Sequence, residues 1–364
     1  MEVLNEWDYA GGLIGYNSGT ISNSSTTGTV KISDFNAGGL VGTNYGEIIN
    51  CFSEANVSPI GTASGGYPYQ MGGLVGYNSG GIIRNSYAKG FVNGWETVGG
   101  LVGENYNGLV DYCYSEGNVT GNEEYIGGLV GTNGYNSIVR DSYSLATVSG
   151  IYYIGGLVGY NSSLIEGSHH KIGIVTGVEK VGGLVGDNNG TISESYSTST
   201  VSGNKYIGGI SGYSGYGEIK LSYAYGSATG VFSVGGLVGS AQNTAINNSY
   251  ATGSVTGSDE VGGLAGHLSV GSSVNNCYSV GLVTGTINVG GLIGSKTTSL
   301  ILPTVANSYY NSQTSNQTDN TGKGVPKTTE EMLAKSTYES WNFEDIDGIW
   351  GIADLSYPYL KWQD

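Results

Sequence analysis

Side chains able to do chemistry are sparse in this sequence, and the acidic ones stand mostly alone. The chain has 29 acidic side chains, 13 basic side chains and three histidines among 364 residues. Acid–base chemistry on a glycosidic bond needs two carboxylates held close together. The acids here fall mainly in turn-like stretches such as Glu123-Glu124 and Asp259-Glu260. We therefore interpret them as solvated turn residues and predict no catalytic residue.

Two further groups of residues resemble metal ligands, and neither has a suitable pattern. His169 and His170 are adjacent, and neighbouring residues of a strand point to opposite faces of a sheet. Asp345 and Asp347 precede Gly348 as in part of a calcium loop, but the remaining ligands are missing. We predict neither a metal site nor a cofactor.

The element that must position all these side chains is a repeat. The block Gly99-Gly100-Leu101-Val102-Gly103 recurs at intervals of 26 to 28 residues, with one interval of 34. Eleven copies begin at Gly11, Gly38, Gly72, Gly99, Gly127, Gly155, Gly182, Gly208, Gly235, Gly262 and Gly290. Between the blocks, strand-like runs alternate with turns, so each repeat closes one coil of a stack with a spacing of about 4.8 Å. The period predicts an all-β fold, a parallel β-solenoid like a right-handed β-helix, with about eleven coils of about 27 residues.

Alignment of the repeats orients the strand that ends each coil. Glu54, Lys89 and Glu116 fall in one column, and a charged column must face water. The column two positions earlier shares that face, and it holds Phe52, Tyr87, Tyr114, Tyr143, Tyr196, Tyr223, Tyr250, Tyr278 and Tyr309. We predict an external tyrosine ladder. Glu54 and Glu116 lie two coils apart, about 9 to 10 Å, near the upper limit for an inverting pair, but an exposed flat face offers no cleft.

Two other columns are predicted to be structural. Cys51, Cys113 and Cys277 each precede the aromatic position, so they face inward as buried free thiols, too far apart for disulfides. A column of asparagines follows the glycine block at Asn17, Asn44, Asn78, Asn105, Asn133, Asn161 and Asn188. Stacked asparagines can hydrogen-bond along the axis. The run ends at Ser214, and we expect less order at this corner in later coils.

The glycine block itself has two interpretations. Val98, Gly100 and Val102 alternate with Gly99, Leu101 and Gly103, so both sides of the segment are apolar. Such a strand is either covered on both faces or kinked by a glycine bulge.

The repeats end near residue 310, and the remainder has a different composition. A polar stretch from Asn311 to Lys327 leads into Thr328, which is predicted to cap a short helix with Glu331. Six aromatic residues follow within 22 positions, beginning at Trp341. An open solenoid end exposes apolar surface and unpaired strand edges. We therefore predict a solenoid over residues 1–310 and, over residues 311–364, a linker and an aromatic-rich C-terminal cap.

The best candidate for ligand binding is the turn before the glycine block. This turn varies more between repeats than the strands do, and in the N-terminal half it is rich in aromatic residues. The 34-residue repeat also inserts an aromatic loop between Ser58 and Gln70. The candidate residues are Tyr67, Tyr69, Trp95, Tyr125, Tyr152 and Tyr153. Exposed aromatic rows suit stacking on sugars or packing against a protein, although the rings could equally shield the turn from water.

Composition excludes several classes of partner. The net charge of −16 makes nucleic acid and anionic membranes unfavourable partners. No run of about 18 apolar residues is present, so no membrane insertion is predicted. No signal segment opens the chain at Met1, which fits either a trimmed chain or one that is not exported.

The repeated Gly-Gly-Leu-Val-Gly, followed by a strand such as Asn85-Ser86-Tyr87-Ala88, resembles the GLUG repeat of bacterial secreted and surface proteins over about residues 10–310. The tail from Thr328 to Trp362 looks like the segment that commonly closes such arrays. Members of this family include filamentous-haemagglutinin-like adhesins and immunoglobulin A peptidases, in which the repeats are usually accessory. The resemblance implies an exported cell-surface scaffold, and it transfers no catalytic residue.

We expect a secreted or cell-surface scaffold or adhesin stalk, within a larger parent polypeptide or alone. Its partner would be a glycan or surface protein of a host or neighbouring cell, bound along the aromatic edge. The alternative is a polysaccharide-active lyase or hydrolase on the same fold.

Overall fold

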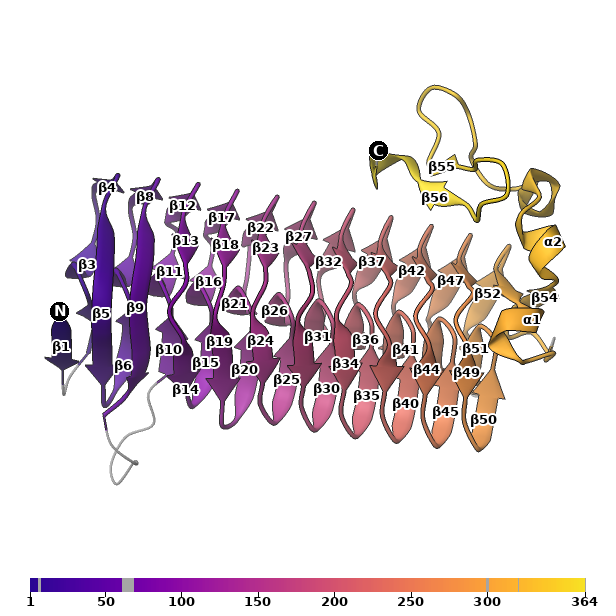
Figure 1. Ribbon diagram of the computed structural model, residues 1–364, viewed down its shortest axis with the longest axis horizontal. Coiled ribbons are helices and arrows are strands. Elements are labelled where there is room, and N and C mark those ends of the chain that lie inside the picture. The colour runs from indigo at the N-terminus through magenta and orange to yellow at the C-terminus, as the bar shows by residue number, and fades with distance from the viewer. Residues whose placement is uncertain (6–7, 61–68, 299–300, 320, 364) are drawn as a thin grey trace.

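The computed structural model describes residues 1–5, 8–60, 69–298, 301–319 and 321–363, and its eleven coils form one elongated stack (Figure 1). Three sheets each contain eleven strands, one from every coil, and a fourth sheet contains 21 strands. Like residues of successive coils pair in parallel register, as Val75 does with Val102 and Val102 with Val130. The predicted parallel β-solenoid is confirmed.

The fourth coil illustrates the plan of the repeat. It contains β15 (Glu96–Gly99), β16 (Val102–Tyr106), β17 (Leu109–Asp111), β18 (Tyr114–Ser115) and β19 (Asn118–Gly121). The last two strands are continuous in the first two coils, as β5 (Ser25–Ile32) and β9 (Phe52–Pro59), and β1 (Glu2–Asn5) pairs with β5. The coil therefore has more and shorter strands than the strand-turn-strand-turn pattern predicts.

The glycine block is a bend between two strands. The chain turns at Gly100 and Leu101, between β15 and β16. A Cβ on Gly99 would lie 1.8 Å from the carbonyl oxygen of Val102, and one on Gly100 would lie 2.0 Å from that of Gly128. Only glycine allows this approach of two backbones. Of the two interpretations, the kinked one is nearer to the structure.

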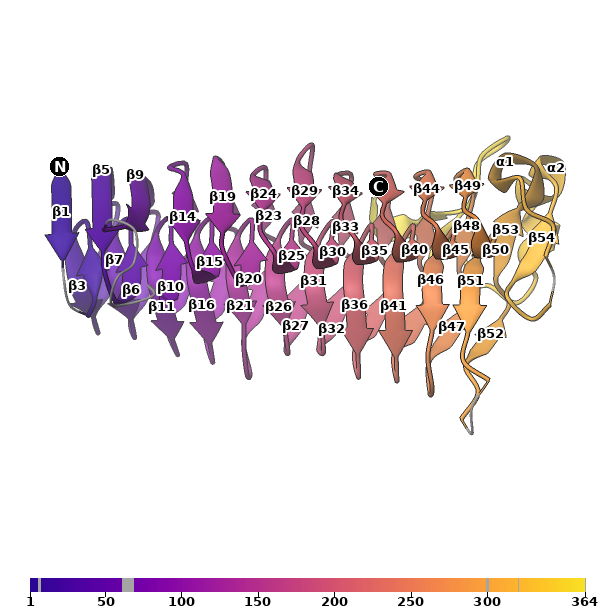
Figure 2. The same ribbon diagram turned by 90° about the horizontal axis from the view of Figure 1, so that it is seen from below.

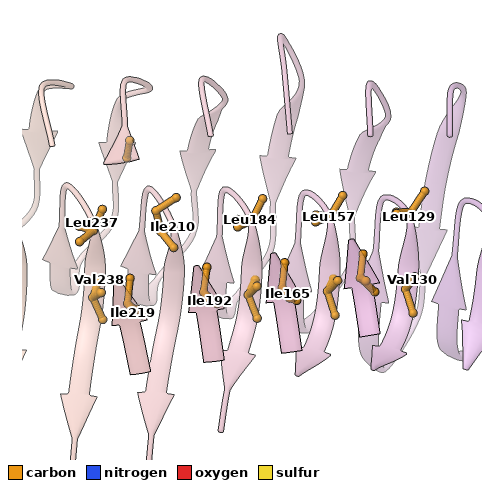
Figure 3. Packing of buried hydrophobic residues seen from close by; sticks show 14 of the residues in the cluster. Leu129, Val130, Leu157, Ile165, Leu184, Ile192, Ile210, Ile219, Leu237 and Val238 are labelled. Atoms are coloured by element: carbon orange, nitrogen blue, oxygen red, sulfur yellow. The ribbon is translucent and has the colours of Figure 1, made fainter. Parts of the chain in front are cut away.

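The bend divides the interior of the coil into two cores. Leu101 and Val102 belong to a column of buried apolar residues that follows the length of the stack, and Figure 3 shows part of it around Leu129 and Leu157. Val98 belongs to a second, separate column. Between the columns, the second glycine of most blocks meets a small residue of the 21-stranded sheet, as Gly100 meets Ser115, whereas Gly156 meets His170 and Gly291 meets Tyr310. We call this constriction the waist, and it confirms that small residues let the sheets approach closely.

The cysteine column faces inward as predicted. Cys51, Cys113 and Cys277 are free and at most 1% exposed. The Cys113 thiol donates to the carbonyl oxygen of Asp111 at 3.2 Å. Burial raises the pKa of Cys113 and of Cys277 to about 12, so both thiols are protonated at neutral pH.

The asparagine column forms a continuous hydrogen-bonded ladder. Each Nδ2 from Asn17 to Asn161 donates to the Oδ1 of the next asparagine at 2.7 to 3.0 Å. Asn188 ends the run on the hydroxyl of Ser214 at 3.2 Å. The expectation of less order beyond this point finds no support in the strand pairing, because Ala241 and Leu268 are buried there and stay in register.

The tyrosine ladder lies on the outer face of the 21-stranded sheet. Its rings stack with centroids 4.6 to 5.2 Å apart and interplanar angles of at most 11° from Phe52 to Tyr278, and His169 takes the tyrosine position in the sixth coil. Next to it, His170 points inward and is fully buried. The two histidines lie on opposite faces, as predicted.

The open end of the last coil is covered by the polar stretch, which was predicted only as a linker. The last strand of the eleventh coil, β53 (Tyr309–Asn311), pairs with β54 (Val325–Lys327) of this stretch. The helix α1 (Ser312–Ser315) lies between the two strands in sequence. The Tyr310 ring is buried against Gly291, and Gln317 donates to the carbonyl oxygen of Val283 at 3.2 Å. We call the described residues of 311–327 the end cap.

The aromatic tail lies along the flank of the stack, which corrects its predicted place over the end. We call residues 328–363 the flap, and Figures 1 and 2 show it running back beside the later coils. The flap contains α2 (Thr329–Met332), a 3-10 turn at Lys335–Tyr338, β55 (Trp350–Gly351), β56 (Tyr359–Leu360) and a final 3-10 turn at Lys361–Gln363. Thr328 caps α2 in a capping box with Glu331, as predicted.

The flap binds the tyrosine ladder. Its buried residues Trp341 and Trp350 form one apolar cluster with Tyr223, Tyr250 and Tyr278 of the ladder. The hydroxyl of Tyr278 donates to the carbonyl oxygen of Pro358 at 2.6 Å. Stacked ladder rings expose a wide apolar strip, and burying it against tryptophan stabilises both parts.

Candidate ligand-binding seam

The glycine bend produces a concave corner on the outside of the stack. In every coil, the residue two places before the glycine pair has a left-handed backbone, with φ between 50° and 64°. In several coils a contact joins its side chain to the residue seven positions later on the next strand, as Lys180 joins Asp187 and Asn36 joins Thr43. We call these paired columns the seam: Tyr125 and Thr132, Tyr153 and Tyr160, Lys180 and Asp187, Tyr206 and Tyr213, Ser233 and Ser240, Glu260 and His267, and their equivalents in the other coils.

The middle of the seam is aromatic. The rings of Tyr125 and Tyr153 stack with centroids 5.0 Å apart, and Tyr160 meets Tyr125 edge-on at 5.6 Å. Lys180 Nζ lies 4.5 Å from the ring centroids of both Tyr153 and Tyr213. Burial, followed by the negative charge of Glu124, raises the pKa of Tyr125. Tyr125 therefore stays neutral, and Lys180 lies against the faces of Tyr153 and Tyr213.

The structure places the predicted ligand-binding residues in two groups. Tyr69 stacks on Phe35 at 5.6 Å in the early coils, and Tyr67 lies outside the described residues. Tyr125, Tyr152 and Tyr153 lie together on β20 (Glu124–Gly127) and β25 (Tyr152–Gly155). Trp95 is half-buried on the coil between the two groups.

A small pocket opens beside the second group. It has a volume of about 160 Å³ and is lined by Glu124, Tyr152, Tyr153, Glu179 and Lys180. Glu124, Tyr152 and Glu179 are register neighbours on three successive strands, so the two glutamates lie about 9 to 10 Å apart along the axis. Tyr152 is 38% exposed, whereas Tyr153 is half-buried. The pocket thus offers one accessible ring between two acceptor groups.

Acidic neighbours crowd one side of this pocket. Burial, followed by the charges of Glu124 and Glu123, raises the pKa of Glu96. Lys180 Nζ lies 2.7 Å from a carboxylate oxygen of Asp187, so its charge is already compensated. The local field therefore disfavours an anionic ligand.

The interpretation of Glu260 as a solvated turn residue is wrong. The pKa of Glu260 is lowered to about 2, and the main cause is its hydrogen bond with His267. Ser295 donates to Glu260 at 2.9 Å and Ser233 also donates to it, while the second ring nitrogen of His267 lies 3.2 Å from the hydroxyl of Thr297. Sequence analysis missed this cluster because its members are joined across the bend, at a spacing of seven, and not along a strand.

A second pocket of about 420 Å³ lies beside this cluster, next to the end cap. Ser295, Thr297, Lys296 and Lys323 line it. Lys296 donates to the carbonyl oxygen of Gly322 at 2.8 Å, and Lys323 donates to the carbonyl oxygen of Gly294 at 3.1 Å. Both ammonium groups thus tie the end cap to the last coil.

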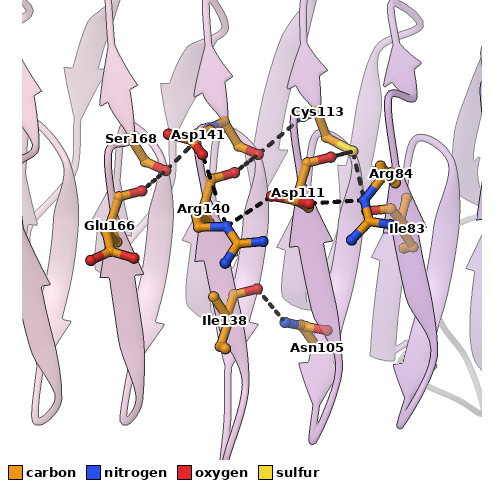
Figure 4. Close-up of polar contacts among 11 residues, drawn as sticks. Ile83, Arg84, Asn105, Asp111, Cys113, Ile138, Arg140, Asp141, Glu166 and Ser168 are labelled. Atoms are coloured by element: carbon orange, nitrogen blue, oxygen red, sulfur yellow. Dashed lines mark hydrogen bonds and ion pairs between the residues drawn. The ribbon is translucent and has the colours of Figure 1, made fainter.

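A row of charged residues on the sheet that contains β17 has a structural role. Asp111 is buried and accepts from Arg84 at 2.9 Å and from Arg140 at 3.0 Å (Figure 4). Burial works to raise the pKa of Asp111, but the two arginines outweigh it and lower the pKa. On the ladder face, Lys89 pairs with Glu116 at 3.3 Å. Each row alternates charge between coils, which favours the observed register.

Within the described residues, no group of three or more histidine, cysteine, aspartate or glutamate side chains is arranged to hold a metal ion. The same part of the chain has no helix of the length and apolarity needed to cross a membrane.

Fold and seam define a parallel β-solenoid protein built from one repeat. A family model described as the GLUG motif matches residues 9–31, 33–58, 67–93, 96–120, 122–149 and 230–256. Six stretches of this chain therefore carry the GLUG motif.

Two further proteins show a partial similarity to this chain. A protein of Evansella cellulosilytica, provisionally described as a Gly-rich membrane protein, is 46% identical over 56 residues. That match spans 15% of this chain and only 6% of the relative. A crystal structure from Bacteroides ovatus, provisionally described as an immunoglobulin A1 protease, is 20% identical with a TM-score of 0.37, over 78% of each chain.

Proposed function

We propose that this chain is a secreted or cell-surface scaffold whose seam binds a neutral glycan of a host or neighbouring cell. The GLUG repeats support the scaffold, because a stack of near-identical coils holds its surface residues at fixed spacing. The description of the Evansella cellulosilytica relative as a membrane protein supports a location at the cell surface.

The observation that carries the binding proposal is the pocket of Glu124, Tyr152 and Glu179. An exposed ring flanked by two carboxylates suits a sugar, since the ring stacks on the apolar sugar face and carboxylates accept hydrogen bonds from hydroxyl groups. A volume of about 160 Å³ corresponds to about five waters of the liquid. A pocket of this size suits one sugar ring better than a large apolar side chain of a protein partner.

Geometry favours this pocket over the tyrosine ladder as the sugar platform. Ladder rings stack face to face at about 5 Å, so they present only their edges to the solvent. Tyr152 is followed in its column by Glu179, which leaves a face of the tyrosine ring without a stacked neighbour on that side. The acidic surroundings and the net charge of −16 favour a neutral glycan over an anionic one.

The test is binding of the whole chain to an array of neutral and anionic glycans, followed by calorimetry with the best neutral glycan. Tyr152→Ala should weaken binding about tenfold, the equivalent of one aromatic contact of about 1.4 kcal/mol. Tyr135→Ala is the matched control, because Tyr135 is 64% exposed and lies outside the seam. Equal affinity of the Tyr152→Ala variant and the parent chain would overturn the proposal.

Cleavage of a polysaccharide is the second candidate, favoured by the two carboxylates at one pocket. Their separation of about 9 to 10 Å lies at the upper limit for an inverting pair. Incubation with the bound glycan should then release reducing ends, and Glu124→Gln should abolish release while binding persists. Absence of products with the parent chain would leave binding alone as the function.

A further inference from the structure

Half of the tyrosine ladder is left uncovered by the flap. Tyr223, Tyr250 and Tyr278 are 1 to 6% exposed beneath the flap. Phe52 and Tyr87 belong to the same continuous stack but remain only half-buried. The covered half demonstrates that the face of this sheet can be buried against another apolar surface.

Apolar side chains gather around the uncovered half. Phe91, Leu145, Ile172 and Ile174 are all exposed there, and Ile172 is 88% exposed. They belong to the third, fifth and sixth coils, on or beside strands of the 21-stranded sheet. Under the flap, the matching positions include Val280, which packs against the apolar cluster. Contiguous exposed apolar surface of this kind marks an interaction site.

The same face is electrically neutral in an acidic protein. Among the described residues, its outward strand positions in coils two to seven carry two acids, Glu54 and Glu116, and two bases, Lys89 and Lys171. The whole chain has a net charge of −16. Two copies of the chain would therefore repel each other least if they met through this face.

We propose that a second copy of this chain docks on the uncovered half of the ladder, antiparallel, about a two-fold axis near Glu116. Columns then match across the interface, and Glu54 of one copy faces Lys171 of the other, because their coils lie two steps on either side of the Glu116 coil. Glu116 meets its own counterpart at the axis, where the ion pair of each carboxylate with Lys89 at 3.3 Å offsets the repulsion. The ladder residues and Leu145 pack between the two sheets. Such an isologous contact closes on itself and forms a dimer rather than a fibre.

The available area fits a modest dimer interface. Coils two to six match one another about this axis, and five coils of about 4.8 Å by a strand width of about 20 Å give roughly 500 Å² for each copy, or about 1,000 Å² in total. That value is at the lower end for specific complexes, so we expect dissociation in the micromolar range. The seam lies across the waist from the ladder, so both seams stay free in the dimer and face opposite directions.

Sedimentation velocity of the whole chain tests the proposal over a range of about 1 to 200 µM. The parent chain should pass from monomer to dimer, and Ile172→Asp should remain monomeric throughout. Ile346→Asp is the matched control, because Ile346 is 80% exposed in the flap, away from this face, and it should behave as the parent does. Circular dichroism of each variant excludes a folding defect.

A charge exchange tests the antiparallel arrangement. Glu54→Lys alone should weaken the dimer several-fold, and combining it with Lys171→Glu should restore it. A parent chain that stays monomeric, or a dimer that survives Ile172→Asp, overturns the interface. A double variant no tighter than the single variant overturns the antiparallel register.

Discussion

His170 should make the stability of the sixth coil depend on pH. Its column holds small residues in the neighbouring coils, Ser144 and Ser197, and the imidazole is fully buried in their place. One ring nitrogen lies 2.9 Å from the carbonyl oxygen of Ala146, and the other lies 2.6 Å from the hydroxyl of Ser199. Burial lowers the pKa of His170 from 6.5 to about 4, although the neighbouring carbonyl groups oppose that change.

The sign and size of the effect follow from this depressed pKa. Between about pH 6.5 and pH 4 the unfolded chain binds a proton at this site that the folded chain does not, so stability falls as the pH falls. The stability that comes from keeping His170 neutral is fully present above about pH 6.5. The difference between the two pKa values corresponds to about 3 kcal/mol.

The assay is urea unfolding of the parent chain and of His170→Ser between about pH 7 and pH 4. The substitution restores the serine of the neighbouring coils, so it removes the titration and keeps the column. Apart from the adjacent His169, whose pKa is lowered first by burial and also by the charge of His170, the other groups are the same in both proteins. The parent should therefore lose up to about 3 kcal/mol more than the variant. Identical pH slopes would refute the reasoning, because His170 would then carry its proton inside the fold.

Three further predictions concern the ladders and the tail. Asn105→Ala should cost about 3 kcal/mol by urea unfolding, because it removes one hydrogen-bond partner from each of the buried amides of Asn78 and Asn133. Asn118→Ala on the surface should cost little, and equal costs would contradict a structural ladder. Removal of residues 328–364 should expose the covered ladder rings and increase the binding of an apolar dye, while the end cap still covers the last coil. Removal of residues 311–364 should also cause end-to-end association of the stacks. Fibre formation after the first truncation would contradict the role of the end cap. The Cys113 thiol should resist alkylation until denaturant is added, and rapid labelling of the folded chain would place this column on the wrong face.

Column positions could be predicted from the sequence because a period of two fixes which residues share a face. Glu54 and Lys89 must face water, which places the tyrosines outside and Cys113 inside. The Asn ladder was predictable for a related reason, since one polar residue repeats at one corner. These inferences need only the repeat and the alternation of a strand.

The seam and the flap could not be predicted in the same way. The left-handed backbone before the glycine pair occurs at residues as different as Tyr125, Lys180 and Glu260. No residue type therefore predicts this conformation. The contacts across the bend follow from that backbone. The aromatic tail was recognised as a cover, but its sequence contains nothing that distinguishes the open end from the ladder, and the ladder offers the larger apolar strip.

The sequence does not separate the two adjacent tyrosines of the predicted aromatic edge. Tyr152 and Tyr153 are adjacent in sequence, yet only Tyr152 projects as an exposed ring beside the pocket, because Tyr153 stacks on Tyr125. The acceptor groups Glu124 and Glu179 were assigned to solvent as ordinary turn residues. Their meeting with Tyr152 depends on the register of three coils.

Hydrogen–deuterium exchange with and without the neutral glycan selected on the array tests the central claim most directly. Glycan bound in the seam should protect amides of Glu124–Gly127, Tyr152–Gly155 and Glu179–Gly182 and leave those of β17 (Leu109–Asp111) unchanged. Protection confined to β17 and its neighbours, on the charged row of Arg84 and Asp111, would contradict the assignment of the seam as the binding site.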